Sequence, residues 1–359
     1  MNGEEVLVTG GSGFLAAHCI LHLLDAGYRV RTTVRAPSRE AEVRALVASR
    51  GATAVDRLSV FTADLTATAG WPEAAAGCSF VLHVASPYPR AEPDNPNTVV
   101  VPARDGTIRV LRAARDAGVK RVVITSSFGA IGYGPSVSEN ADRSRGKPRA
   151  GVGRLFDETD WSATNGEAGA FIWSKTLAER AAWKFIQSEG GDLELSVINP
   201  VALFGPVLGP RLSTSVALLQ NLLNGTISPL PHASISAVDV RDVAELHLRA
   251  MTHPDAAGER FIASTGSPLT YLQIAQLLKS RLGDDANRVP TRQLPDWMAW
   301  IVSPFTPEIG AILPQLGPPK VVSNAKAKRV LGWAPRTNVE AILACAESLL
   351  ARGLVTARR

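Results

Sequence analysis

The chain has few cysteines and no long apolar run. Its three cysteines, Cys19, Cys78 and Cys345, lie far apart and match neither a disulfide framework nor a metal-binding pattern. No apolar segment reaches the roughly 18 residues that a membrane-spanning helix needs. The stretch "EEVLVTG" reads as a first strand with no basic and apolar leader before it. We therefore expect a cytoplasmic protein that binds neither a membrane nor a metal.

The charge is nearly balanced and is spread along the chain. Against 33 Asp and Glu residues there are 38 Lys and Arg, and the net charge of +5 has no basic cluster that would favour nucleic-acid binding. The composition, 45% hydrophobic and 20% charged, is ordinary for a globular protein. A chain of 359 residues has room for a dinucleotide-binding domain and one smaller unit.

Short apolar runs alternate with helical patterns over residues 1–200. Repeated strand–helix units need crossover connections, so they predict a doubly wound α/β fold whose parallel sheet is buried on both faces. The predicted strands are residues 6–9, 28–34, 58–62, 80–84, 122–125 and 195–198. Predicted helices include residues 15–25 and 107–117, each followed by a glycine that can end a helix.

The chain changes character in two places. Residues 134–168 are rich in Gly, Ser, Arg and Asp and lack periodicity, which predicts a long loop at the ligand-binding edge of the sheet. Residues 201–359 carry several Pro and Trp and predict a smaller mixed lobe for substrate binding, with some segments returning to the first domain.

The stretch "VLVTGGSGFLAAHC" links the first predicted strand to a helix. Gly10 permits a tight turn, Gly13 allows the backbone to approach a pyrophosphate, and Ala16 keeps the helix close to the sheet. The N–H groups at the start of that helix favour a phosphate group. The residues expected to bind the cofactor here are Thr9, Gly10, Ser12, Gly13, Phe14 and Leu15.

The second predicted strand ends in Arg35, with Ser38 and Arg39 just beyond. An NAD site usually has Asp or Glu at this position, whereas a guanidinium pairs with the 2′-phosphate of NADP. We therefore expect NADP(H). Further cofactor contacts are expected at the ends of the third and fourth strands, namely at Asp64, Leu65, Val84, Ala85 and Ser86.

Two stretches form a candidate catalytic slot. "RVVITSSFGAIGYG" ends the fifth strand in hydroxyl side chains, of which Ser127 is suited to bind a carbonyl oxygen. "GAFIWSKTLAER" is an amphipathic helix in which Lys175 follows Phe171 by four residues, so the two share a face.

Together these stretches resemble the extended short-chain dehydrogenase/reductase family, in particular its dihydroflavonol reductase, cinnamoyl-CoA reductase and microbial aldehyde reductase branch. The resemblance covers nearly the whole chain and rests on "VTGGSGFLAAHCILHLLDAGYRVRTTVR", "TSSFGA", "SKTLAERAAW", "VDVRDVAELH" and "LGWAPRTNVEAI". It implies a Rossmann-type domain, NADPH-dependent reduction of a small-molecule carbonyl, and a monomer or homodimer.

The resemblance also assigns roles by position. Ser127 would bind the substrate oxygen, Lys175 would hold the nicotinamide ribose, and the backbone at Asn199 and Pro200 would border the nicotinamide. The family has a proton-donating tyrosine where this chain has Phe171. Loss of a general acid typically costs about 10²–10⁴ in rate, so we expect crippled turnover with cofactor binding retained.

Three interpretations of Phe171 stay open. The protein is a reductase with a Tyr-to-Phe substitution, natural or introduced to trap a complex. Alternatively, it is a natural reductase that needs no tyrosine at 171, because its substrate is a pre-protonated imine or because Tyr133 is the donor. The third interpretation is an NADP(H)-binding sensor without catalysis. A sugar-nucleotide epimerase or dehydratase is disfavoured because position 35 is not acidic. The residues expected to line an apolar or aromatic substrate pocket are Phe128, Trp173, Phe204 and Leu208.

Overall fold

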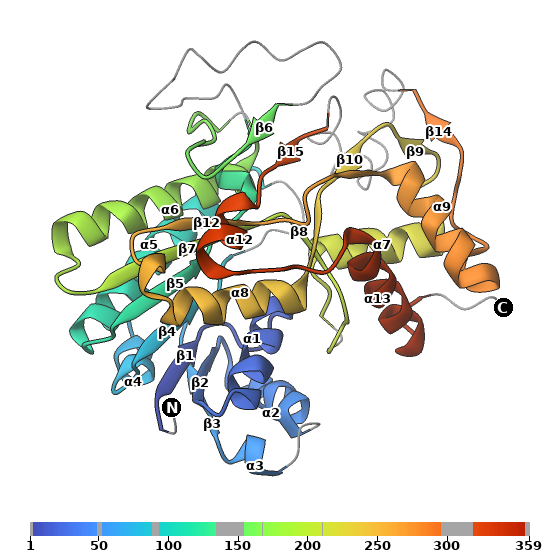
Figure 1. Ribbon diagram of the computed structural model, residues 1–359. Coiled ribbons are helices and arrows are strands. Elements are labelled where there is room, and N and C mark those ends of the chain that lie inside the picture. Colours follow the sequence, from blue (N-terminus) through green and yellow to red (C-terminus); the bar gives the residue numbers. More distant parts are fainter. Residues whose placement is uncertain are drawn as a thin grey trace.

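A parallel sheet with helices on both faces forms the larger part of the protein, and a smaller lobe lies beside it (Figure 1). The computed structural model describes residues 3–48, 52–87, 93–133, 154–166, 168–209, 211–295 and 319–355. Most of the predicted loop 134–168 therefore lies outside the described residues. Among those described, no helix is both long and apolar enough to span a membrane.

The sheet has seven strands in the order β12-β7-β5-β4-β1-β2-β3, and every neighbouring pair is parallel. The strands are β1 (Glu5–Val8), β2 (Arg29–Val34), β3 (Leu58–Thr62), β4 (Phe80–His83), β5 (Arg121–Thr125), β7 (Glu194–Pro200) and β12 (Arg260–Ala263). The strand order reverses between β1 and β4, which is the switch point where such sheets bind ligands. This is the Rossmann-type arrangement that the sequence predicts.

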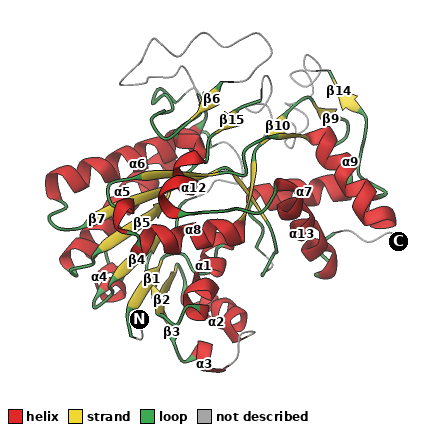
Figure 2. Cartoon of the chain, in the orientation of Figure 1, coloured by secondary structure: helices red, strands yellow, loops and turns green. Residues whose placement is uncertain are grey.

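Strand residues alternate between two cores because successive side chains point to opposite faces. Val6 and Val8 pack into the core under helices α1 (Phe14–Asp25) and α8 (Val240–Thr252). Leu7 packs into the core under α5 (Asn97–Asp116) and α6 (Ala170–Glu189). Figure 2 shows these two helix pairs on either side of the sheet. All six predicted strands are present, with boundaries shifted by at most two residues.

Helix α5 is longer than the predicted helix at 107–117 and carries Pro102 within it. Gly106, inside the same helix, has a low intrinsic helix propensity. A Cβ at this position would come 2.7 Å from Leu65 Cβ, so glycine permits close packing of this helix. Tertiary packing therefore overrides the local breakers. Four shorter helices also belong to the larger part of the protein: α2 (Glu40–Ala48), α3 (Ala52–Val55), α4 (Trp71–Ala75) and α12 (Ala325–Leu331).

The lobe has its own core, formed mainly by helices α7 (Thr214–Asn224), α9 (Tyr271–Leu282) and α13 (Asn338–Ala351). Short strand pairs join it: β8 (Ala202–Phe204) with β11 (Ala237–Asp239), β9 (Leu230–Pro231) with β14 (Gln293–Leu294), and β10 (Ser234–Ile235) with β13 (Leu269–Thr270). A further pair, β6 (Leu155–Phe156) with β15 (Val321–Val322), lies near α6 (Figure 1). Of the C-terminal residues, α8 and β12 belong to the sheet layer rather than to the lobe.

Candidate active site

The turn between β1 and α1 leaves room for a phosphate group. Gly10 has φ +75°, and a Cβ there would lie 3.1 Å from Ala85 Cβ. A Cβ on Gly11 would lie 2.2 Å from Thr32 Oγ1, so this position also requires glycine. Gly13 is the N-cap of α1, and in the described chain this helix has neither a side-chain cap nor an acidic residue in its first turn. Its first N–H groups are therefore available to an anion.

Thr9 supports this turn from inside the protein. Its side chain has no exposed surface, and its Oγ1 accepts hydrogen bonds from the N–H groups of Val84 (3.0 Å) and Ala85 (2.9 Å). The same oxygen lies 2.9 Å from His83 Nδ1. Thr9 thus holds the loop after β4 in place, a positioning role instead of the direct cofactor contact that the sequence suggested. Of the neighbouring predicted residues, Leu15 is a core residue and Phe14 is partly buried.

Two arginines gather where β2 ends. The Arg35 guanidinium is 66% exposed and lies 3.5 Å from the Asp64 carboxylate, and Arg39 Nη1 lies 3.5 Å from Ser12 Oγ. Hydrogen bonds from Thr66, assisted by Arg35, hold the pKa of Asp64 below its usual value. The arrangement presents two guanidinium groups and a hydroxyl at one end of the phosphate-binding turn.

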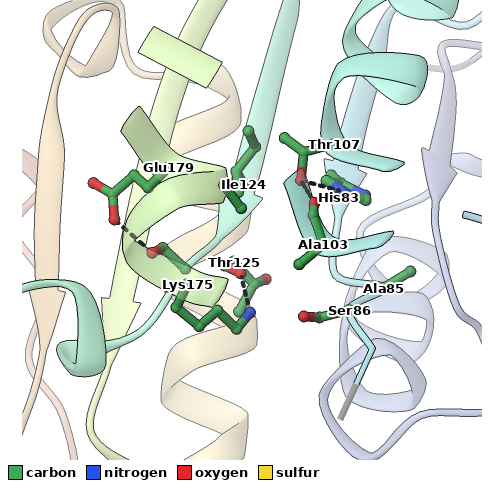
Figure 3. Close-up of a pocket in the computed structure, with 11 residues that line it drawn as sticks. His83, Ala85, Ser86, Ala103, Thr107, Ile124, Thr125, Lys175 and Glu179 are labelled. Atoms are coloured by element: carbon green, nitrogen blue, oxygen red, sulfur yellow. Dashed lines mark hydrogen bonds between the residues drawn. The ribbon is translucent and has the colours of Figure 1, made fainter. Parts of the chain in front are cut away.

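Lys175 lies at the carboxyl end of β5. Its side chain is buried, and Nζ donates a hydrogen bond to the Thr125 carbonyl oxygen at 3.0 Å (Figure 3). Burial lowers the pKa of Lys175 to about 8, against the opposing effect of the Glu179 carboxylate. Phe171, one turn earlier on the same face of α6, is partly exposed. The lysine is therefore still mostly an ammonium group at neutral pH, but it holds its proton less tightly than an exposed lysine does.

Ser127 follows β5 and caps the short 3-10 helix η2 (Phe128–Ala130). Its Oγ accepts a hydrogen bond from the Gly129 N–H at 2.9 Å, which leaves the hydroxyl hydrogen for another acceptor. Asn199 Nδ2 donates to the Ser127 carbonyl oxygen at 3.2 Å, so the end of β7 supports the serine. Asn199 itself is fully buried.

A cavity of about 20 Å³ lies beside Lys175. Figure 3 shows Lys175 and Glu179 on one side of it and His83 and Thr107 on the other, with Ser86 near the lysine. Burial lowers the pKa of His83 to about 3, so this imidazole is neutral and packed. The cavity lies between the predicted cofactor loop after β4 and helix α6, which carries Lys175.

The sequence predicts Phe204 and Trp173 for the substrate pocket. Phe204 is completely buried in the core of the lobe, because β8 faces α7 there. Trp173 packs beside Gly166, on the opposite side of α6 from Phe171 and Lys175, since two helical residues turn the side chain by about 200°. The prediction for Phe204 is corrected, because its hydrophobic side chain is buried in a core. Trp173 is only partly buried, and its contact with a substrate stays a prediction.

The other two predicted pocket residues remain near the sheet. Phe128, directly after Ser127, is buried and makes edge-to-face contacts with Tyr133 and Phe156. Leu208 is partly buried against the sheet-side core. An aromatic cluster (Phe128, Tyr133 and Phe156) therefore lies next to the serine.

Sequence reasoning missed Gly11 and Glu179, and it noted Arg39 only as a residue just beyond Arg35. Gly11 was passed over although "TGGSG" contains it, and Glu179 was read only as part of a family pattern. The doubled glycine could have been used to predict a crowded turn. No local pattern predicts the role of Glu179, because its hydrogen-bond partners belong to β5, β7 and β12 or to the residue directly after them.

The fold and this site define a Rossmann-type dinucleotide-binding protein with a lysine and a serine at the carboxyl edge of its sheet. Residues 6–263 match the NAD dependent epimerase/dehydratase family. The chain belongs to that family, the extended short-chain dehydrogenases/reductases.

Similar proteins include several plant reductases. Cinnamoyl-CoA reductase CAD2 of Medicago truncatula is 35% identical over 82% of this chain and 83% of its own, and dihydroflavonol 4-reductase of Zea mays is 32% identical over 77% and 74%. Among solved structures, Gre2 of Candida albicans in complex with NADPH has a TM-score of 0.77 and 25% identity, covering 97% of this chain and 99% of its own.

Proposed function

We propose that this protein is an NADPH-dependent reductase of an apolar or aromatic aldehyde or ketone, with proton donation weakened by Phe171. The observation that carries the proposal is the buried Lys175 ammonium on the Thr125 carbonyl oxygen, beside Ser127 at the switch-point edge of the sheet. The reductase names of the curated relatives support the same reaction class. A cytoplasmic location and the oligomeric state remain predictions.

The residues present fit NADPH. Gly10 and Gly11 keep the phosphate-binding turn free of side chains, and the uncapped start of α1 offers N–H groups. Arg35 and Arg39 suit a 2′-phosphate, and an acidic side chain that would prefer a free ribose is absent from the described end of β2. The bound cofactor would supply the hydride.

The chain's own groups would then handle the substrate oxygen. Ser127 Oγ, already an acceptor for the Gly129 N–H, would donate its hydroxyl hydrogen to the carbonyl oxygen. Lys175 would bind the nicotinamide ribose and supply positive charge near the developing alkoxide. Phe171 offers neither a proton nor a hydrogen bond, so the rate should fall by about 10²–10⁴ relative to a tyrosine.

The test compares NADPH oxidation by this protein and by Phe171→Tyr over a panel of aromatic and aliphatic aldehydes, ketones and a cinnamoyl thioester. We expect the tyrosine variant to be faster by about 10²–10⁴ on its best substrate, with a similar affinity for NADPH. Equal rates would contradict the weakened-acid mechanism, and absence of turnover in both despite NADPH binding would favour a sensor.

A second candidate is a reductase that uses Tyr133 as its acid. The observation that favours it is Lys320 Nζ, which lies 4.5 Å from the centre of the Tyr133 ring. A cation over the ring stabilises a phenolate, and Tyr133 also contacts Phe128, the neighbour of Ser127. On this alternative the chain turns over as it stands, and Tyr133→Phe abolishes the rate.

A further inference from the structure

Glu179 joins the catalytic helix to three strands of the sheet. This carboxylate, four residues after Lys175 on α6, has no exposed surface. Its Oε2 accepts hydrogen bonds from Ser126 Oγ at 2.5 Å and Asn199 Nδ2 at 2.8 Å, and its Oε1 accepts from Arg260 Nε at 2.6 Å. The partners lie at the end of β5, on β7 and on β12.

The same hydrogen bonds lead to the reactive serine. Ser126 immediately precedes Ser127, and its N–H donates to the Ile198 carbonyl oxygen at 2.8 Å. Asn199 Nδ2, besides binding Glu179, donates to the Ser127 carbonyl oxygen. A shift of the Glu179 carboxylate would therefore move the backbone on both sides of Ser127.

The network also reaches the segment before α6. The Arg260 guanidinium, held by Glu179, donates to the carbonyl oxygens of Glu158 (2.8 Å) and Asp160 (3.0 Å) and lies 3.7 Å from the centre of the Trp161 ring. This segment is the described end of the predicted substrate loop. Glu179 is thus connected to both the catalytic helix and that loop.

The charge of Glu179 acts on Lys175. Burial lowers the pKa of the lysine, and Glu179 raises it in the opposite direction. From β4, His83 faces the lysine, but its pKa of about 3 leaves it neutral. Arg260, on β12, is paired with Glu179 itself. Within the described chain, Glu179 is the carboxylate that favours the ammonium form of Lys175.

We propose that Glu179 is a positioning residue of this site, which aligns Ser127 through Ser126 and Asn199 and places a negative charge one helical turn from Lys175, beside the same cavity. The inference rests on the proposed function, because that function gives Ser127 and Lys175 their roles. A buried ion pair such as Glu179–Arg260 is often no more stabilising than apolar residues of similar size, so stability alone does not account for it.

The test measures the titration of Lys175 in the cofactor-free protein by the ¹³Cε chemical shift of labelled lysine, assigned with Lys175→Met. We expect Glu179→Gln to lower the pKa of Lys175 by about one unit. The affinity for NADPH, measured by fluorescence, should fall by about fivefold. This is the effect expected if the less charged lysine binds the nicotinamide ribose with one net hydrogen bond fewer. Glu189→Gln, an exposed carboxylate at the end of the same helix, is the matched control and should change neither quantity.

A second variant distinguishes the loss of the Glu179 charge from a general loss of stability. Glu179→Gln leaves Arg260 as an unpaired buried charge, whereas Glu179→Met/Arg260→Met removes both charges together. We expect the double variant to fold and to show the same lowered pKa of Lys175. An unchanged lysine titration in the folded double variant would overturn the inference. Neither measurement needs a substrate, so a failure of the proposed reductase activity would be seen separately.

Discussion

At the scale of single residues, we expect Arg35 to distinguish NADPH from NADH. Its guanidinium lies largely in solvent at the end of β2 and is only loosely paired with Asp64, at 3.5 Å. Arg39, held near Ser12, adds a second positive charge. These guanidinium groups can form charge-assisted hydrogen bonds with the 2′-phosphate of NADPH, whereas the uncharged ribose hydroxyls of NADH form only weaker hydrogen bonds with them.

We predict that Arg35→Ala weakens NADPH binding by about 10- to 100-fold, because a hydrogen bond to a charged group contributes roughly 1.5–3 kcal/mol. NADH binding should hardly change. Fluorescence titration with each cofactor measures both affinities. Arg44→Ala serves as the control, since Arg44 pairs with Glu40 along α2. An equal loss for NADH and NADPH would contradict the assignment of Arg35 to the phosphate.

At the scale of elements, the β1–α1 turn depends on a close approach to β2. Thr32 is fully buried, and its Oγ1 donates to the Val8 carbonyl oxygen at 2.7 Å, so the threonine has little freedom to move away from Gly11. The turn and the second strand therefore share one tightly packed contact. Cofactor binding and stability should respond to it together.

We predict that Gly11→Ala destabilises the protein by about 1–3 kcal/mol, as overpacking usually does, and weakens NADPH binding. The substitution should cost much less in a Thr32→Ala background, because removal of Oγ1 and Cγ2 makes room for the new methyl group. Urea unfolding of the two single variants and the double variant measures this coupling. Additive losses would show that the contact between Gly11 and Thr32 is not the cause.

At the scale of the whole molecule, three buried histidines link stability to pH. Burial lowers the pKa of His18 to about 4, of His83 to about 3 and of His247 to about 4. Unfolded histidine titrates near 6.5. Between these values the unfolded chain binds more protons than the folded one, so stability rises with pH and falls as the solution is acidified.

We predict that the free energy of unfolding is nearly independent of these groups above pH 7 and declines below pH 6.5, by about 1.4 kcal/mol per pH unit for each histidine. Urea unfolding between pH 8 and 5 measures the slope. His247→Gln should reduce the slope by the contribution of one histidine. The substitution also removes the hydrogen bond between His247 Nε2 and Thr125 Oγ1, which lowers stability at every pH. A flat profile down to pH 5 would contradict the neutral, buried state of these side chains.

The local sequence pattern was enough to predict the strands, the glycine-rich turn after β1, and the helix that puts Phe171 and Lys175 on one face. Each of these features depends on residues close together in the chain: alternating burial for strands, glycine at a turn, and the helical period that puts residues four apart on one face. The position of Arg35 was predictable for the same reason, because it directly follows its strand, whereas its role at a 2′-phosphate stays a prediction.

Only the tertiary structure decided which side chains face the site. The hydrophobicity of Phe204 was evident, but whether this side chain meets a ligand or a core depended on the packing of the lobe. Thr9 and Glu179 act through partners 74 and 81 residues away, His83 and Arg260 respectively. Hydrogen bonds over such separations arise from the order of strands in the sheet, which single-sequence periodicity does not contain.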